Sequence, residues 1–150
     1  MDKYLSKKEY LKKYDSNVGY ALYVQNNIKR NDYVRLNTGE IVRVIGIKEN
    51  KLNKKAIYYG TYEQDWFDSS AVENFSDNII DLVEIDDYVN RYRVVAIMED
   101  METGEIHLEM TSDYTNEIIG DCTIYNDDIK SIVTHEQFAN VEYKVETEDK

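Results

Sequence analysis

The chain has 150 residues, with 18 Lys and Arg against 30 Asp and Glu, a formal net charge of −12, one cysteine and no proline. This length suits one compact domain or two very small ones. The single cysteine excludes an intrachain disulfide framework, and the lack of a signal peptide or a long apolar run predicts a soluble, cytoplasmic protein.

Branched and aromatic residues dominate the apolar set, with 15 Ile, 13 Val and 14 Tyr against 7 Leu. Such side chains fit a pleated surface, so the composition predicts a mainly β fold. The charge is uneven along the chain. Residues 1–55 hold 13 basic and 6 acidic residues, a net of +7, whereas residues 56–150 hold 5 and 24, a net of −19. An asymmetry of this kind is informative about binding partners.

A helical segment is expected at the N-terminus. Ser6 and Glu9 are spaced as in a capping box, and apolar residues then recur at helical intervals up to Tyr14. Residues 18–28 are ambiguous between a second helix and an extended segment, with helix or irregular entry favoured. We therefore assign residues 1–30 to an N-terminal helical appendage.

The first β-unit is expected over residues 31–85. Residues 33–36 alternate, residues 37–40 supply a hairpin turn, and residues 41–47 return as a second strand. A third strand follows at residues 56–60, then a long connection over residues 61–76. A closing strand is expected at residues 79–85.

A second unit is expected over residues 86–150, because segments of the first unit recur there. Residues 32–47 return in shortened form at 87–97, and residues 77–83 resemble residues 127–133. The remaining predicted elements are an acidic turn at 99–105, strands at 106–110, 122–125 and 129–133, a helical turn opened by Thr134 and a last strand at 141–145. The rhythm within each unit predicts two tandem SH3-like small barrels.

The later half also resembles a group of small uncharacterised proteins of phages and prophages of Gram-positive bacteria. The resemblance rests on residues 78–90, NIIDLVEIDDYVN, on residues 128–138, DIKSIVTHEQF, and on residues 141–145, VEYKV. It implies a phage accessory protein that acts in the cytoplasm of a bacterial host. That group often has Gly before Asp-Tyr-Val, where this chain has Asp86.

No motif of the sequence predicts catalysis, a cofactor or a metal site. His107 and His135 lie in separate predicted units, and no HxH, HxxxH or CxxC spacing is present. Adjacent carboxylates on a strand point to opposite faces and do not form an acid–base couple. We therefore expect a protein without enzymatic activity.

Carboxylates cluster on the predicted acidic turn and along the first long connection. A dense array of them resembles a phosphate backbone and is suited to a basic nucleic-acid-binding groove on a host protein. The leading hypothesis is a phage-encoded inhibitor, a nucleic-acid mimic directed at a nucleic-acid-handling or CRISPR-type defence factor. The residues expected to bind this partner are Glu99, Asp100, Glu102, Glu105, Glu109, Asp65, Asp68 and Glu73.

Other interpretations stay open. The acidity can serve solubility alone, and Trp66 and Phe67 can simply pin their connection to the barrel. A KOW- or Tudor-like module would bind nucleic acid directly with aromatic rings beside lysines. The residues of that alternative site are Lys51, Lys54, Lys55, Tyr59, Tyr62 and Trp66. A phage structural or assembly adaptor is a third possibility.

Overall fold

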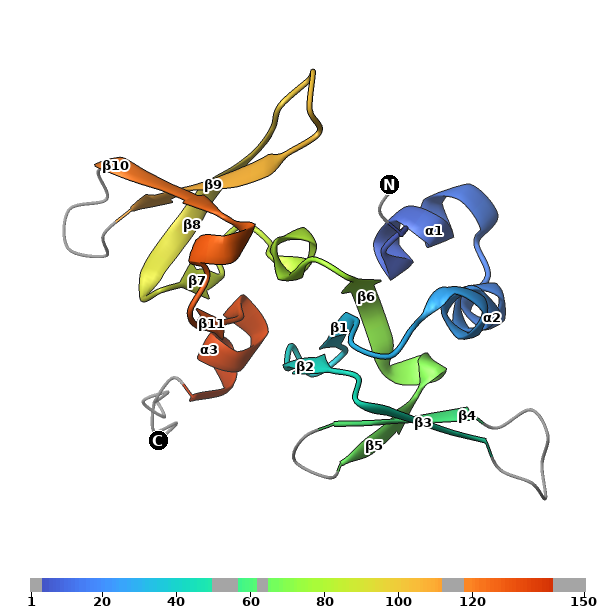
Figure 1. Cartoon of the computed structure of the whole chain (residues 1–150). Helices are drawn as coiled ribbons and strands as arrows, with labels where there is room; N and C mark the ends of the chain where they lie inside the picture. The colour runs from blue at the N-terminus through green and yellow to red at the C-terminus, as the bar shows by residue number, and fades with distance from the viewer. Residues whose placement is uncertain (1–3, 50–56, 62–64, 112–117, 142–150) are drawn as a thin grey trace, which may run out of the picture.

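The computed structural model describes residues 4–49, 57–61, 65–111 and 118–141, with the backbone alone for 118–122 and 139–141. The chain is mainly β, as predicted. Figure 1 shows two halves, one with β1 to β6 and the helices α1 (Lys7–Tyr14) and α2 (Asn17–Asn27), the other with β7 to β11 and α3 (His135–Val141). The strands are β1 Tyr33–Leu36, β2 Ile41–Arg43, β3 Gly46–Glu49, β4 Ile57–Gly60, β5 Trp66–Asp68, β6 Val72–Ser76, β7 Tyr88–Val89, β8 Tyr92–Glu99, β9 Ile106–Thr111, β10 Ile118–Tyr125 and β11 Ile132–Val133.

The helices near the N-terminus begin at hydroxyl caps. The Glu9 amide donates to the Ser6 hydroxyl at 3.2 Å, and the Ser6 amide donates to the Glu9 carboxylate at 3.1 Å, which confirms the capping box. The ambiguous segment at 18–28 is helical and forms most of α2. Its residues Tyr20 and Val24 are buried in the first core, so α2 belongs to the body of the first half and is more than an appendage.

The two halves open with the same hydrogen-bonded segment. The carboxylate of Asp32 accepts from the Lys29 amide at 2.8 Å, and that of Asp87 accepts from the Glu84 amide at 2.7 Å. The carbonyl of Asp32 accepts from the Val44 amide, and that of Asp87 accepts from the Val94 amide. The residues just before these aspartates, Asn31 and Asp86, both have positive φ, 77° and 76°. These matched bonds place Asp32 and Asp87 at equivalent positions.

After the first strand of each half, the chain returns as an antiparallel strand whose course differs between the two halves. In the first half it bends at Val44, so that β2 pairs with β1 while β3 pairs with β4. In the second half β8 continues, with a register shift between Val94 and Ala96, and it pairs with both β7 and β9. The sheets therefore run β2-β1-β6, β3-β4-β5 and β10-β9-β8-β7-β11. Among the described residues the strands stay in these three sheets and close no barrel.

The closing strand of the first half was predicted wrongly. It is β6, which pairs with β1 through Val34 and Phe75, as β11 pairs with β7 through Val89 and Ile132. The predicted strand at 79–85 instead contains the 3-10 helix η2 (Ile79–Leu82), which buries Ile80 and Leu82. Because β6 already occupies the edge of β1, the similar residues 77–83 and 127–133 are not structurally equivalent.

The connection at 61–76 holds more structure than predicted. It contains β5, the 3-10 helix η1 (Ser69–Ala71) and β6, whose pattern of burial is not a simple alternation. In the second half, β10 leads through the 3-10 helix η3 (Asn126–Asp128) into β11. Val141 ends α3, and the rest of the strand predicted at 141–145 lies outside the described residues.

Two hydrophobic cores lie in the two halves. The first includes Val34, Val44 and Phe75 with residues of α2, and the second includes Val89, Val94 and Leu108. Ile80 and Val83 pack in the second core, although they precede its first strand. In the part of the chain that the structure describes, no helix has the length and apolar character needed to cross a membrane.

The turn between β1 and β2 packs tightly on the start of α3. Gly39 has φ 89°, and a Cβ at this position would lie 2.6 Å from the Glu136 side chain. We expect Gly39→Ala to lower the free energy of unfolding by about 2–4 kcal/mol, because backbone strain and overpacking add. Gly104→Ala is the matched control, since Gly104 has φ 73° with nothing within 4 Å of its Cβ position. Equal losses in urea unfolding would show that the contact with α3 is not formed.

Candidate functional site

The hairpin of β8 and β9 projects from the second half (Figure 1) and ends in an ordered turn. One carboxylate oxygen of Asp100 accepts from the amides of Glu102 at 2.8 Å and Thr103 at 2.9 Å, and the Asp100 amide donates to the Glu105 carbonyl. The hydrogen bonds from the Thr103 and Glu102 amides lower the pKa of Asp100 below its ordinary value. Asp100 is thus part of the turn itself, and the neighbouring glutamates are carried on a fixed backbone.

The sequence-predicted acidic residues fall into separate places. Glu99, Asp100, Glu102 and Glu105 are exposed together at the hairpin end, whereas Glu109 is half-buried in the middle of β9. The others lie in the first half, where Asp65 and Asp68 are exposed at β5 and Glu73 on β6 pairs with Lys7 at 3.9 Å. Asp68 also caps η1 through the Ser70 amide. Of the eight predicted residues, the four at the hairpin end are therefore the ones that the structure brings together as one exposed group.

A hollow of about 760 Å³ lies beside the hairpin and adds carboxylates that the sequence did not point to. Glu99 and Glu105 line it from the hairpin, Asp81 from η2 and Asp127 from η3. The Ile80 amide donates to the Asn126 side chain at 3.0 Å and so joins η2 to η3. The described lining holds no lysine, arginine or histidine. We call these four carboxylates, with Asp100 and Glu102, the acidic wall.

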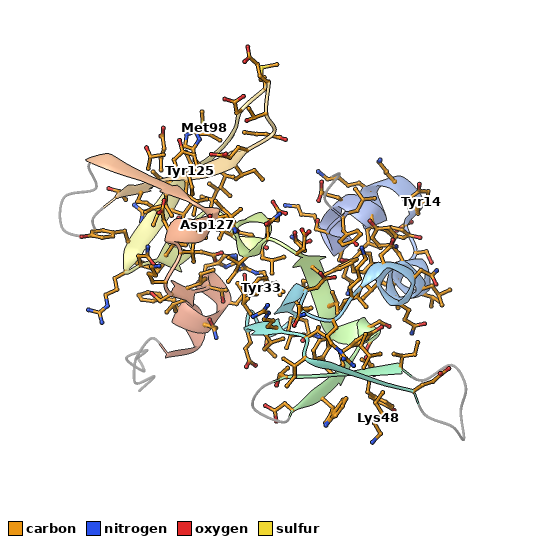
Figure 2. All side chains as sticks on the ribbon, viewed as in Figure 1. Tyr14, Tyr33, Lys48, Met98, Tyr125 and Asp127 are labelled. Atoms are coloured by element: carbon orange, nitrogen blue, oxygen red, sulfur yellow. The ribbon has the colours of Figure 1, made fainter. Side chains whose placement is uncertain are left out.

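The outer face of the neighbouring sheet is partly apolar. Met98, His107 and Tyr125 are register partners across β8, β9 and β10, so their side chains share one face. Met98 is 45% exposed and Tyr125 is 42% exposed. Figure 2 shows both near the base of the hairpin, with Asp127 on the same half. An exposed Met and Tyr bordered by acidic groups is the composition of an interface core with a polar rim.

The alternative aromatic and basic site is only partly visible. Lys51, Lys54, Lys55 and Tyr62 lie outside the described residues. Tyr59 is only 1% exposed and belongs to the first core, so it is not available for stacking, contrary to the prediction.

Trp66 is 51% exposed and lies in one row with Gly46 and Gly60 across β3, β4 and β5. A Cβ on Gly60 would lie 3.0 Å from the indole, so the glycine leaves room for the ring on the sheet. The Lys48 ammonium lies 5.6 Å from the ring centroid, within the range of a cation–π contact. A base that stacked on Trp66 would have to displace this lysine.

A third group of charges lies where the two halves meet, around the buried guanidinium of Arg35 on β1. Arg35 donates to both carboxylate oxygens of Asp87, at 2.6 and 3.0 Å, and to both of Glu136, at 2.8 Å. It also donates to the Leu82 carbonyl and lies 3.4 Å from Glu84. Burial works against its charge, but the hydrogen bonds to Asp87 and Glu136 outweigh burial and raise the pKa of Arg35.

The equivalent aspartates have different neighbours. Both are buried, and Asp87 lies beside the guanidinium of Arg35. Burial raises the pKa of Asp32, an effect that the hydrogen bond from the Lys29 amide opposes. No sequence signal pointed to the Arg35 group, because Arg35 is 52 residues from Asp87 and 101 residues from Glu136. The nearest hint was the capping form at Thr134, which the structure confirms through the Thr134 and Gln137 contacts.

Comparison with known proteins adds no relative: no family model, no curated protein and no solved structure matches the chain.

Proposed function

We propose that this protein is a non-enzymatic binding protein whose acidic wall occupies a basic nucleic-acid-binding groove on another protein. The observation that carries the proposal is the convergence of Glu99, Glu105, Asp81 and Asp127 around one hollow whose described lining lacks basic side chains. Carboxylates held on ordered turns present a fixed negative field, which attracts a groove built for phosphates.

The fold supports a finer proposal, that each half is an SH3-like small barrel unit. In both halves the first strand pairs with the second and also with the last, and a 3-10 helix precedes the last strand. When the first strand of a short antiparallel sheet also pairs with the last, the sheet bends toward the closed form of a small barrel. Such units commonly act as binding modules, so this organisation fits a protein that works by contact.

The phage resemblance of the later half gives the proposal its setting. Within it, the partner is a host nucleic-acid-handling factor, with a CRISPR-type defence nuclease as the specific candidate. The acidic wall would compete with nucleic acid for the partner's lysines and arginines. Competition of this kind weakens with salt, because surface charges more than about 10 Å apart are screened near 0.1 M ionic strength.

The proposal is tested by displacement of host proteins from nucleic acid. A lysate of a Gram-positive host is loaded on DNA-cellulose, and the column is eluted with the purified protein at low salt. We expect the elution of at least one basic protein that remains bound in buffer alone. If nothing elutes, the proposal fails.

The same purified protein can be used to distinguish the proposed mimic from the alternative, a module that binds nucleic acid directly. An electrophoretic shift with single-stranded DNA or RNA, lost on Lys48→Ala and Trp66→Ala, would favour a nucleic-acid-binding module in place of a mimic. For the mimic we expect no shift at the salt concentration at which the host protein elutes.

A further inference from the structure

Three potential metal ligands converge at the junction of the two halves. The His135 Nε2 atom lies 2.9 Å from Glu84 Oε1 and 2.5 Å from Glu136 Oε1. Glu84 comes from the segment between η2 and β7, and His135 and Glu136 open α3. The ligand atoms of the three residues all lie within 4.8 Å of one another. The sequence concealed this group, because Glu84 precedes His135 by 51 residues.

Among the described members of this group, three carboxylates meet one guanidinium, which leaves an excess of two negative charges. Arg35 and Asp87 form a buried pair with two hydrogen bonds, in which one positive charge meets one negative charge. Glu84 and Glu136 then remain as two negative charges around an imidazole that is neutral when it acts as a ligand. A divalent cation matches that surplus, whereas protonation of His135 offsets only half of it.

Arg35 also holds the two carboxylate ligands of this group in place by hydrogen bonding and ion pairing. Its guanidinium holds both oxygens of Glu136 at 2.8 Å and lies 3.4 Å from Glu84 Oε2, which leaves Glu84 Oε1 directed at His135. Carboxylate ligands are commonly fixed by such hydrogen bonds. Because Asp87 neutralises Arg35, the guanidinium positions the carboxylates without dominating the local charge.

We propose that Glu84, His135 and Glu136 bind a divalent transition-metal cation, with Zn²⁺ as the preferred ion. One imidazole nitrogen and two carboxylates suit Zn²⁺ better than the all-oxygen preference of Mg²⁺ or Ca²⁺. Bonds of about 2.0–2.2 Å place ligand atoms roughly 3.3–3.6 Å apart in a tetrahedral site. The two printed separations, 2.9 Å from His135 to Glu84 and 2.5 Å from His135 to Glu136, need to grow by only about 1 Å or less to reach that spacing.

The site is open to solvent, so a cation can enter. The side chains of Glu84, His135 and Glu136 are 50%, 40% and 31% exposed, and both glutamates line a hollow of about 650 Å³. Three protein ligands leave a fourth position for water. A bound cation would tie α3 to the segment before β7 and, through Arg35, to β1.

The test is titration of the chelator-treated full chain with ZnCl₂ by calorimetry, with MgCl₂ as the second ion. We expect 1:1 saturable binding of Zn²⁺, no saturable binding of Mg²⁺ and a Tm raised by Zn²⁺. Glu84→Gln and His135→Asn should each weaken Zn²⁺ binding at least about tenfold. The hydrogen bond that the backbone amide of residue 135 donates to Asp87 is equally available in the Asn variant, and circular dichroism checks that this variant is folded.

The chain supplies its own matched control in its other histidine. His107 lies on β9 with its ring 5.7 Å from that of Tyr125, and His107→Asn should bind Zn²⁺ like the unaltered protein. In NMR spectra, Zn²⁺ should move the imidazole signals of His135 and leave those of His107 in place. The proposal is overturned if Zn²⁺ does not saturate at 1:1, if His135→Asn binds as tightly as the unaltered protein, or if binding is lost instead on Glu102→Lys.

Discussion

Replacing Glu102 and Glu105 with lysine should weaken binding to the proposed basic partner about 100-fold. Both glutamates are exposed at the hairpin end, and Glu105 also lines the acidic hollow. Reversal turns two attractive contacts into two repulsive ones, and close charge pairs across interfaces are worth about 1.5 kcal/mol or more each. Asp100 is left in place because its carboxylate holds the turn.

The measurement is the dissociation constant of the eluted partner at two salt concentrations. The difference between the reversed variant and the unaltered protein should shrink at high salt, since exposed charges are screened there. Glu49→Lys with Asp65→Lys is the matched control, because it changes the net charge equally at two exposed positions outside the acidic wall, the end of β3 and the residue before β5. Equal weakening by both variants would mean that net charge, and not the acidic wall, determines binding.

Replacing Arg35 with methionine should lower the free energy of unfolding by about 3–5 kcal/mol, because it leaves Asp87 charged and buried without its partner. Domains of this size are stable by only about 5–15 kcal/mol, so the loss approaches global unfolding. The loss in the free energy of unfolding is measured by urea unfolding, followed by circular dichroism.

Two further variants separate the buried charge from general damage to the fold. Arg35→Met combined with Asp87→Asn should be more stable than Arg35→Met alone, because the uncompensated charge is gone while Asn keeps an acceptor for the Glu84 or His135 amide. Arg43→Met is the surface control. Arg43 is exposed and lies over the Tyr33 ring, so its loss should cost about 1 kcal/mol or less. A loss below about 1 kcal/mol for Arg35→Met would contradict the stabilising role of the cluster.

Only some residues of the candidate site could be predicted from the sequence. The exposed end of the hairpin was predicted because its acidic residues are consecutive or nearly so. Asp81 and Asp127 were missed because they join the same hollow from η2 and η3, which meet through a hydrogen bond between residues 46 positions apart. The proposed Zn²⁺ ligands were missed for the same reason, since Glu84 and His135 are 51 positions apart.

The sequence alone determined the features that depend on neighbouring residues. The mainly β character follows from the excess of Ile, Val and Tyr, and the capping boxes at Ser6 and Thr134 follow from side chains three positions apart. The tertiary structure decided which strand completes the first half and which charges surround Arg35. Both depend on an edge or a buried site offered by distant parts of the chain: β6 fills the free edge of β1, and Asp87 and Glu136 approach a guanidinium that water cannot solvate. Local patterns do not encode that competition, because it is settled only when distant segments of the chain pack together.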